Sequence, residues 1–285
     1  MAEAAVGAGT IPARLRRPIA AKPMFAADDD SRHYGPGLKS RVAASIEMPD
    51  ESAIGMAADL RRQMLAYYNE RAPEYEEAYT LGTGTASIRN PEIFKTEALA
   101  LADVVARIAR GRIMDLACGT AYWMPRYAQT CSHVTLFDQS ERMLAEARVK
   151  ADRLGIVDRC VLVQGDFFEH QFDDHAYDTV LIGFFLSHLT EGQEGAVFDG
   201  VRRMLAPGAR CLILESAWSA ERAQVNAKVE RQARRLNDGT RFEVYKRYCD
   251  RDDIARWAQE HRFTPRIEYF GRALCAVSGT FHGGS

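Results

Sequence analysis

Acidic side chains stand where short apolar segments of this chain end. Asp115 closes one such segment and is followed by the small residues Ala117-Cys118-Gly119-Thr120, and Asp138 closes the next segment, 23 residues after Asp115. Small residues let a backbone approach a ligand closely, and a carboxylate at such a place can accept hydrogen bonds from both hydroxyls of a ribose. These residue types at this spacing predict a nucleoside-binding site.

Two further apolar segments end in residues that could complete such a site. Gly165-Asp166-Phe167-Phe168 offers a carboxylate for an amino group and aromatic rings for a planar base. The fourth segment ends at Phe184-Phe185-Leu186-Ser187-His188. A histidine with an ordinary pKa of about 6.5 suits a general base near neutral pH, but a lone histidine can equally satisfy a buried backbone group. Phe167 and Phe184 can likewise belong to the core, so these roles stay open.

The apolar segments alternate with helical ones. Strands are expected at 112–116, 134–138, 160–164, 177–183 and 210–215, with helices over 124–130, 140–154 and 194–205, the second of them capped by Ser140. Strands that alternate with helices form right-handed crossovers in a parallel sheet. In an open sheet of this kind ligands bind at the carboxyl ends of the strands, where the residues above are found.

The segments before and after this alternation differ from it in composition and in the order of their expected elements. Residues 1–50 are rich in Ala, Gly, Pro and charge without sustained periodicity, which predicts a disordered tail, with an organelle transit peptide as the alternative. Helices are expected from Ser52, from Pro73, and from Asn90-Pro91 to Arg110. After Glu215 we expect a polar helix over 220–236 stopped by Asn237-Asp238-Gly239, a strand at 242–248, a helix over 252–261, and a hairpin of strands at 264–270 and 273–281.

Segment 217–248 interrupts the alternation, and we expect it to form a lid that reads the substrate, because loops at strand ends carry specificity. Its aromatic residues could sandwich a planar or apolar substrate; they are Trp218, Phe242, Tyr245 and Tyr248. Arg71 and Lys246 are expected to be solvated charges, with an anionic substrate as the alternative.

Composition limits the kinds of partner. The net charge of −2 gives no basic field for nucleic acid, and no apolar run approaches the roughly 20 residues that cross a bilayer. The six cysteines have no metal-like spacing, so no metal is expected. A cytoplasmic enzyme with reduced thiols, acting as a monomer or homodimer without nucleic-acid or membrane partners, is the simplest interpretation.

Several motifs resemble those of the class I S-adenosylmethionine-dependent methyltransferases. The run Ile113-Met114-Asp115-Leu116-Ala117-Cys118-Gly119-Thr120-Ala121-Tyr122-Trp123 is similar to the glycine-rich first motif of that family. Asp138 falls where the family has its ribose-binding acid, and Gly165-Asp166 where it has its adenine-contacting acid. Leu205-Ala206-Pro207-Gly208 resembles the turn before the fifth strand, and Tyr67-Tyr68-Asn69-Glu70-Arg71-Ala72-Pro73-Glu74-Tyr75 looks like the helix that closes over the cofactor.

The resemblance implies a doubly wound α/β domain over residues 91–285, with a mainly parallel sheet of seven strands, the last antiparallel, and cofactor-covering helices over 51–90. It implies S-adenosyl-L-methionine as cofactor and His188 as the candidate general base. The implied cofactor-binding residues are Tyr68, Tyr75, Asp115, Ala117, Cys118, Gly119, Thr120, Asp138, Gln139, Met143, Gly165, Asp166, Phe167 and Phe184.

One position departs from the family pattern. Ala121 stands where the family usually has glycine, and alanine tolerates a right-handed helical conformation but not a positive φ. If Ala121 has a helical conformation, the replacement of glycine by alanine changes little. If it does not, the affinity for the cofactor is in question.

The activity implied is in-line transfer of a methyl group to a small molecule, at oxygen or nitrogen. Strand four lacks the Asn/Asp-Pro-Pro-aromatic motif of relatives that methylate adenine or glutamine amides, and the chain has no basic stripe, so DNA methylation is not expected. A non-catalytic S-adenosylmethionine-binding or regulatory protein is one alternative. A nicotinamide-dependent oxidoreductase is another, but it should carry G-x-G-x-x-G after the first strand. The sequence leaves the substrate and the atom methylated open.

Overall fold

A computed structural model describes residues 51–80, 88 and 90–282, and for residues 51–58 it describes the backbone alone. The tail predicted over residues 1–50 lies outside the described residues.

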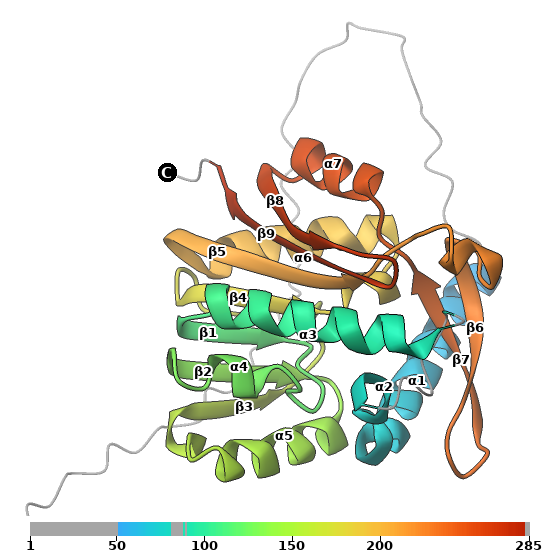
Figure 1. The fold of residues 1–285 in the computed structure, drawn as a ribbon, viewed down its shortest axis with the longest axis horizontal. Coiled ribbons are helices and arrows are strands. Elements are labelled where there is room, and N and C mark those ends of the chain that lie inside the picture. Colours follow the sequence, from blue (N-terminus) through green and yellow to red (C-terminus); the bar gives the residue numbers. More distant parts are fainter. Residues whose placement is uncertain (1–50, 81–87, 89, 283–285) are drawn as a thin grey trace, which may run out of the picture. The chain divides into compact units, whose positions relative to one another are not determined.

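Seven strands form the central sheet in the order β3-β2-β1-β4-β5-β9-β8 (Figure 1). They are β1 (Gly111–Leu116), β2 (Cys131–Asp138), β3 (Cys160–Gln164), β4 (Tyr177–Gly183), β5 (Leu205–Ser216), β8 (Phe263–Phe270) and β9 (Leu274–Phe281). Neighbours from β3 to β5 pair in parallel, and β9 runs antiparallel to both β5 and β8. The chain winds outward from β1 through β2 to β3 and returns through β4 to β5, so the strand order reverses between β1 and β4. The predicted fold, including the antiparallel last strand and the C-terminal hairpin, is confirmed.

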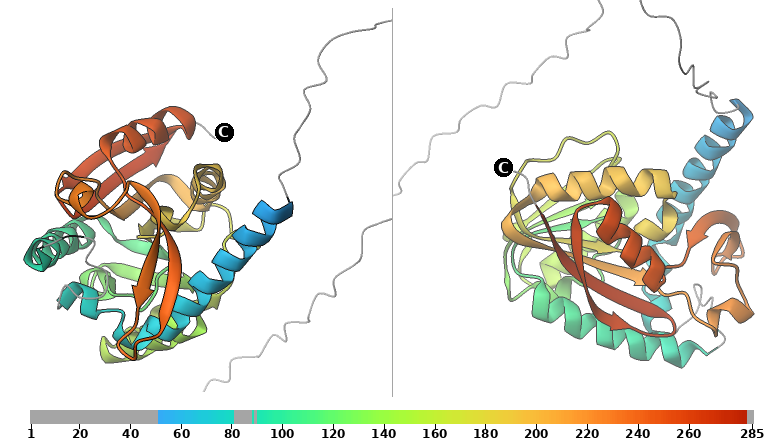
Figure 2. Two further views of the ribbon diagram at one scale, coloured as in Figure 1. Left: turned by 90° about the vertical axis from the view of Figure 1, so that its right-hand side faces the viewer. Right: turned by 90° about the horizontal axis from the view of Figure 1, so that it is seen from above.

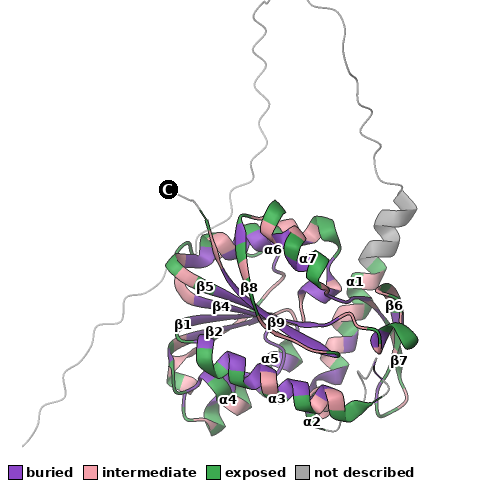
Figure 3. Ribbon diagram, turned by 45° about the horizontal axis from the view of Figure 1, so that its top comes forward, coloured by how far each residue is buried: buried purple, intermediate pink, exposed green. Residues whose placement is uncertain are grey.

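Helices cover both faces of the sheet (Figures 2 and 3). Along β1 the buried side chains alternate, with Ile113 in one apolar cluster and Met114 in the other. The first cluster includes α3 (Pro91–Ile108), α4 (Met124–Tyr127) and α5 (Glu141–Arg153), and the second includes α6 (Glu191–Met204) and α7 (Arg251–Glu260). Because strands buried on both faces need apolar residues at every position, these segments appear in the sequence as short continuous apolar runs.

Side-chain caps set where several helices begin. The Asn90 side chain accepts a hydrogen bond from the Glu92 amide at the start of α3, and Ser140 accepts one from the Met143 amide at the start of α5. Each cap satisfies an amide that has no partner within its own helix. The N-cap predicted at Ser140 is confirmed.

The carboxyl edge of the sheet is covered by two elements from distant parts of the sequence. One is α1 (Glu51–Arg71), followed by a 3-10 turn (Ala72–Glu74) and α2 (Glu77–Thr80). The other is a hairpin of β6 (Val229–Arg235) and β7 (Arg241–Arg247), which lies beside α1 (Figure 2). The Tyr67 and Phe242 rings join them, with centroids 5.6 Å apart.

The helix predicted over 220–236 is wrong. That segment contains a 3-10 turn (Arg222–Gln224) and strand β6, which pairs antiparallel with β7. Asn237-Asp238-Gly239 was expected to end a helix, but Gly239 has a φ of +92° in the turn that joins the two strands. The long polar side chains of β6 have adequate helix propensity, and pairing with β7 overrides it.

Candidate functional site

A cavity of about 240 Å³ lies at the carboxyl edge of β1, β2 and β4, beside the reversal of strand order. Residues just beyond these strands form its floor, and side chains of α1, among them Leu60 and Met64, form the opposite wall. This is the place where open parallel sheets bind ligands. Of the site residues predicted from the sequence, those that line it are Tyr68, Tyr75, Ala117, Gly119, Asp138, Gln139, Met143, Phe184 and His188.

Asp138 holds the first loop in place and still presents its carboxylate to the cavity. One oxygen accepts a hydrogen bond from the Gly119 amide and the other from the Ser140 amide, each at 2.8 Å. A carboxylate has about four lone-pair positions, so each oxygen keeps capacity for a second donor. Burial raises the pKa of Asp138, against the effect of these backbone donors. The geometry suits a ligand that brings two hydroxyl groups.

The loop after β1 has an unusual backbone. Ala117, Gly119 and Ala121 all have positive φ values, at +52°, +54° and +52°. Alanine in this region is strained by roughly 1–2 kcal/mol relative to a right-handed conformation. Ala121 therefore does not adopt the helical conformation in which its departure from the family pattern would be harmless, and Ala121 is fully buried.

Three residues predicted to contact a cofactor, one in β1 and two in this loop, do not line the cavity. The Asp115 carboxylate is buried and accepts a hydrogen bond from the Tyr127 hydroxyl at 2.7 Å. Burial raises the pKa of Asp115 to about 7, although Tyr127 opposes the shift. Cys118 is buried, which raises the pKa of its thiol well above the ordinary value, and Thr120 donates to Glu76 at 2.7 Å.

The segment after β3 places its residues differently from the prediction. Phe167 packs in the core against Gly200, where an added Cβ would meet its ring at 2.8 Å. Phe168, the other ring expected near a planar base but not among the residues implied by the resemblance, lines the cavity instead. Asp166 accepts a hydrogen bond from the Phe168 amide at 2.9 Å, and neither Asp166 nor Gly165 lines the cavity.

His188 and Tyr68 meet at the inner end of the cavity. His188 Nδ1 lies 2.8 Å from the Tyr245 carbonyl oxygen, and because a carbonyl only accepts, Nδ1 carries the proton. His188 Nε2 is then the acceptor for the Tyr68 hydroxyl, 2.6 Å away. Burial, and next the charge of Lys246, hold the pKa of His188 well below its ordinary value, so this imidazole is neutral near neutral pH.

A second, smaller chamber of about 60 Å³ lies behind this pair. Tyr68, Tyr75, Phe184 and His188 line both spaces, so these four side chains separate them. Phe184 has a φ of +57°, which is strained for a bulky residue. The charged residues of the remaining lining are all cationic: Arg71, Arg222, Arg234 and Lys246.

The burial of two of these cations was not predicted. Arg71 and Lys246 were expected to be solvated, but they expose only 3% and 6% of their surface. Lys246 lies two residues from both Val244 and Tyr248, which are buried. In a strand, residues two apart share a face, so this alternation was a signal that Lys246 points inward.

Within the described part of the chain, no cluster of three or more His, Cys, Asp or Glu side chains could hold a metal ion. No helix among the same residues is long and apolar enough to span a membrane.

Comparisons with known proteins agree with this geometry. Residues 113–208 match a family model described as a methyltransferase domain. The chain is 34% identical over 163 residues to the demethylmenaquinone methyltransferase of Clavibacter sepedonicus, covering 56% of this chain and 62% of that protein. It is 31% identical over 118 residues to the ubiquinone/menaquinone biosynthesis C-methyltransferase UbiE of Roseobacter denitrificans, covering 41% of this chain and 46% of that one. The chain thus spans about half the length of these relatives.

Solved structures share the fold. The structure of a DhpI-SAM-HEP complex has a TM-score of 0.61 at 24% identity, over 77% of this chain and 97% of that one. The PH0226 protein of Pyrococcus horikoshii OT3 has a TM-score of 0.54 at 19% identity, over 73% and 99%.

Proposed function

Because the chain belongs to the class I S-adenosylmethionine-dependent methyltransferases, we propose that it transfers a methyl group from S-adenosylmethionine to a small molecule. The observation that carries this proposal is the pair of adjoining spaces at the carboxyl edge of the sheet. The larger space has a carboxylate, Asp138, directed at it, and the smaller one lies behind Tyr68 and His188. Such an arrangement suits a donor and an acceptor that meet at the shared wall.

The residues that line the larger cavity fit the cofactor. We propose that Asp138 binds the ribose hydroxyls, that Met143 and Phe168 contact the adenine, and that Ala117 and Gly119 allow the backbone to approach the amino-acid end. Tyr68 and Tyr75 would close the cavity from the side of α1. The sulfonium supplies an activated methyl group, so the protein's main task is to position the two reactants.

The acceptor atom is proposed to be oxygen or nitrogen, with His188 beside it. For an acceptor that carries a proton, the Nε2 lone pair of His188 is the atom that would receive that proton. For an acceptor that is already ionised no proton has to leave, and His188 would instead hold the Tyr68 hydroxyl in place.

A second candidate is methylation at a carbon atom. It is favoured by the similarity to the demethylmenaquinone and UbiE methyltransferases, whose names describe quinone substrates or C-methylation. Methyl-labelled cofactor offered with phenols, amines, acids and quinone precursors separates the two, because the labelled product identifies the bond formed. A chain that binds the cofactor and labels none of them would be a binding or regulatory protein.

The cofactor assignment is tested by Asp138→Ala. Loss of hydrogen bonds to a charged group should weaken binding of S-adenosylhomocysteine by about 1–3 kcal/mol. Isothermal titration measures this effect. Asp152→Ala is the matched control, since Asp152 is an exposed aspartate on the neighbouring helix α5. Wild-type affinity in the Asp138 variant would remove the ribose assignment.

A further inference from the structure

The smaller chamber has an unusual concentration of buried positive charge. Arg71, Arg222 and Lys246 expose 3%, 2% and 6% of their surface, and the half-buried Arg234 completes the group. These cations come from α1, the 3-10 turn after β5, β6 and β7, so four separate elements bring them to one space. Burial strongly disfavours an unpaired charge, and long cationic side chains are rarely buried without a partner.

The carboxylates near the chamber are hydrogen-bonded to backbone amides, and from there Glu215 also interacts electrostatically with Lys246 and Glu97 with Arg222. Glu215 accepts hydrogen bonds from the amides of Ser187 and Ser216, and Glu97 accepts three from the backbone of residues 272–274. Arg71 and Lys246 form no ion pair with any carboxylate among the described residues, and the Lys246 ammonium instead donates to Ser187 Oγ at 2.7 Å. Among the described residues, no carboxylate therefore faces the Arg71 guanidinium.

Arg71 shows most directly that a partner is missing. Its guanidinium lies 5.4 Å and 5.5 Å from the ring centroids of Tyr67 and Tyr75, and it donates to the Tyr67 hydroxyl. Its Nε is buried and has no hydrogen-bond acceptor within the described structure. A guanidinium presents its N–H groups in a planar fork that matches carboxylate and phosphate oxygens, so an oxyanion would satisfy it.

The position of the chamber connects this charge with the reaction. Its wall toward the cofactor cavity consists of Tyr68, Tyr75, Phe184 and His188. A volume of about 60 Å³ holds only a small group. An oxyanion bound there would therefore lie next to the four residues that also border the proposed site of the methyl donor, and the transfer would take place between them.

We propose that this chamber binds the methyl acceptor, and that the acceptor is a small molecule whose reacting oxygen belongs to an ionised acid of the carboxylate or phosphate class. The proposal rests on the proposed function. In the transfer, a new oxygen–carbon bond forms as the sulfur–methyl bond breaks, and the electron pair of that bond stays on sulfur. One negative charge of the acceptor and the positive charge of the sulfonium disappear together, and no proton is released.

The state of His188 agrees with this substrate class. Burial and the surrounding charges of Lys246, Arg234 and Arg71 lower its pKa, which makes it a poor acceptor for a substrate proton. An ionised oxygen needs no base. The cations that weaken His188 as a base are the groups that would bind the anion.

The first test measures anion binding to the full chain saturated with S-adenosylhomocysteine, using inorganic phosphate and acetate as probes at constant ionic strength. At least one anion should bind, and Arg71→Met and Lys246→Met should each weaken its binding by about tenfold or more. Arg62→Met is the matched control, because Arg62 is an exposed arginine on the same helix, and it should bind like the unaltered chain.

Each variant is also titrated with S-adenosylhomocysteine. A variant that no longer binds it is treated as misfolded, and the other variant then tests the proposal. The proposal is overturned if neither anion binds the loaded chain, or if the folded Arg71 or Lys246 variants bind it as the Arg62 variant does. Failure of the unaltered chain to bind S-adenosylhomocysteine would instead overturn the proposed function.

The second test follows labelled methyl groups into a panel of small carboxylic acids, phosphoric acids, phenols and amines. A methyl ester of a carboxylate releases the label as methanol in mild alkali. A methyl ester of a phosphate keeps the label, and it elutes from an anion exchanger earlier than the unmethylated acid. Either product supports the proposal and identifies which acid is used. Label found only on phenols, amines or ring carbons would contradict it and leave the methyltransferase function standing.

Discussion

The role of His188 depends on its neighbours more than on its residue type. An exposed histidine would titrate near neutral pH, but this one is buried beside cations and donates its Nδ1 proton to a backbone carbonyl. Its Nε2 receives the Tyr68 hydroxyl at 2.6 Å. The imidazole therefore orients a tyrosine at the wall between the two chambers, whether or not it also accepts a proton.

The substitution His188→Asn separates these roles. Asparagine can donate to the Tyr245 carbonyl and accept from Tyr68, so a positioning role predicts a loss in kcat of less than about tenfold. A general base predicts a loss of about 10²–10⁴-fold. Steady-state kinetics from pH 6 to 8, with the acceptor found by labelling, provide the measurement. A large loss with unchanged cofactor affinity would assign proton transfer to His188 and count against an ionised acceptor.

Asp115 gives a prediction for stability against pH. Burial raises its pKa to about 7 in the folded chain, from an ordinary value of 3.8. A carboxyl whose pKa is raised on folding contributes stability that is complete below pH 3.8 and is lost as the pH rises through 7. The variant Asp115→Asn stays neutral, so its stability relative to the wild type should rise between pH 5 and pH 8 by about 1–3 kcal/mol.

Urea unfolding at several pH values measures that difference. Asp178→Asn is the control, because an ion pair with Arg112 lowers the pKa of Asp178 in the folded chain. Asp178 is therefore ionised above pH 5 in both the folded and the unfolded chain. The stability of Asp178→Asn relative to the wild type should then not change with pH. If the stability of Asp115→Asn relative to the wild type stays constant or falls as the pH rises, the Asp115 carboxyl is already ionised in the folded chain.

At the scale of elements, the strands of the central sheet were predictable from the sequence. Of the hairpin, β7 was predictable and β6 was not. The sheet strands are apolar runs bounded by turns, and burial on both faces makes that pattern strong. Strand β6 is polar, with only Gln232 buried among its residues. Nothing in its own sequence opposed a helix, and the Asn-Asp-Gly signal fits both a helix end and a hairpin turn.

The site was predictable where it depends on strand ends. Asp138 and Gly119 follow directly from the order of strands, because the carboxyl ends of parallel strands meet at one edge. The choice between Phe167 and Phe168 depends on which ring packs against Gly200, a contact with a residue more than thirty positions away. The buried charge of Arg71 depends on the packing of α1 against the hairpin, which no local pattern encodes.

The hairpin is predicted to hold α1 over the cofactor cavity. Phe242 packs on Tyr67 and belongs to a small apolar cluster with Met64 and Val244. Aromatic pairs contribute about 0.5–1.5 kcal/mol beyond their buried area. Phe242→Ala should therefore weaken the binding of S-adenosylhomocysteine by about three- to tenfold and speed amide exchange in residues 241–247.

Amide exchange followed by mass spectrometry, with and without S-adenosylhomocysteine, measures this effect. Val229→Ala is the control on the same hairpin, because Val229 is exposed and lies outside the small apolar cluster. If Phe242→Ala leaves both exchange and affinity unaltered, the hairpin does not act as a lid for this cavity.

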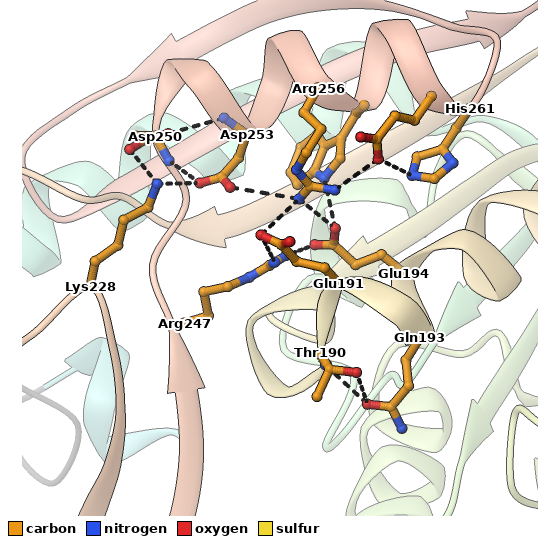
Figure 4. A network of polar contacts seen from close by, with 12 residues as sticks. Thr190, Glu191, Gln193, Glu194, Lys228, Arg247, Asp250, Asp253, Arg256 and His261 are labelled. Atoms are coloured by element: carbon orange, nitrogen blue, oxygen red, sulfur yellow. Dashed lines mark hydrogen bonds and ion pairs between the residues drawn. The ribbon is translucent and has the colours of Figure 1, made fainter. Parts of the chain in front are cut away.

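At the scale of the whole molecule, a buried ionic network joins the hairpin to the helices on one face of the sheet (Figure 4). Glu194 of α6 is fully buried and pairs with Arg247 of β7 and Arg256 of α7, the latter at 2.7 Å. Lys228, just before β6, pairs with Asp250 and with Asp253, the latter at 3.1 Å. These ion pairs connect the hairpin that covers the site to α6 and α7. They are separate from the apolar contact between Tyr67 and Phe242.

Replacing Glu194 shows how much the fold depends on that network. In Glu194→Gln the shape is kept, but the buried Arg247 and the largely buried Arg256 lose the one fully buried carboxylate that they share. Removing one partner of a buried ion pair typically costs about 3–5 kcal/mol, and a cost of this order is expected because Arg247 keeps only the exposed Glu191 as an ion-pair partner among the described residues. Glu191→Gln is the control, since Glu191 approaches the same arginines with an exposed side chain, and it should cost about 0–1 kcal/mol.

Urea unfolding followed by far-UV circular dichroism measures both variants. If the network joins the hairpin and the sheet into one cooperative unit, the Glu194 variant should unfold at lower urea in a single transition. A second transition at low urea would mean that the hairpin unfolds separately once the network is broken, and binding of S-adenosylhomocysteine should then be lost in that first step. Equal stability of the two variants would show that Glu191 replaces Glu194, and that the buried carboxylate is not what fixes β7 beside the site.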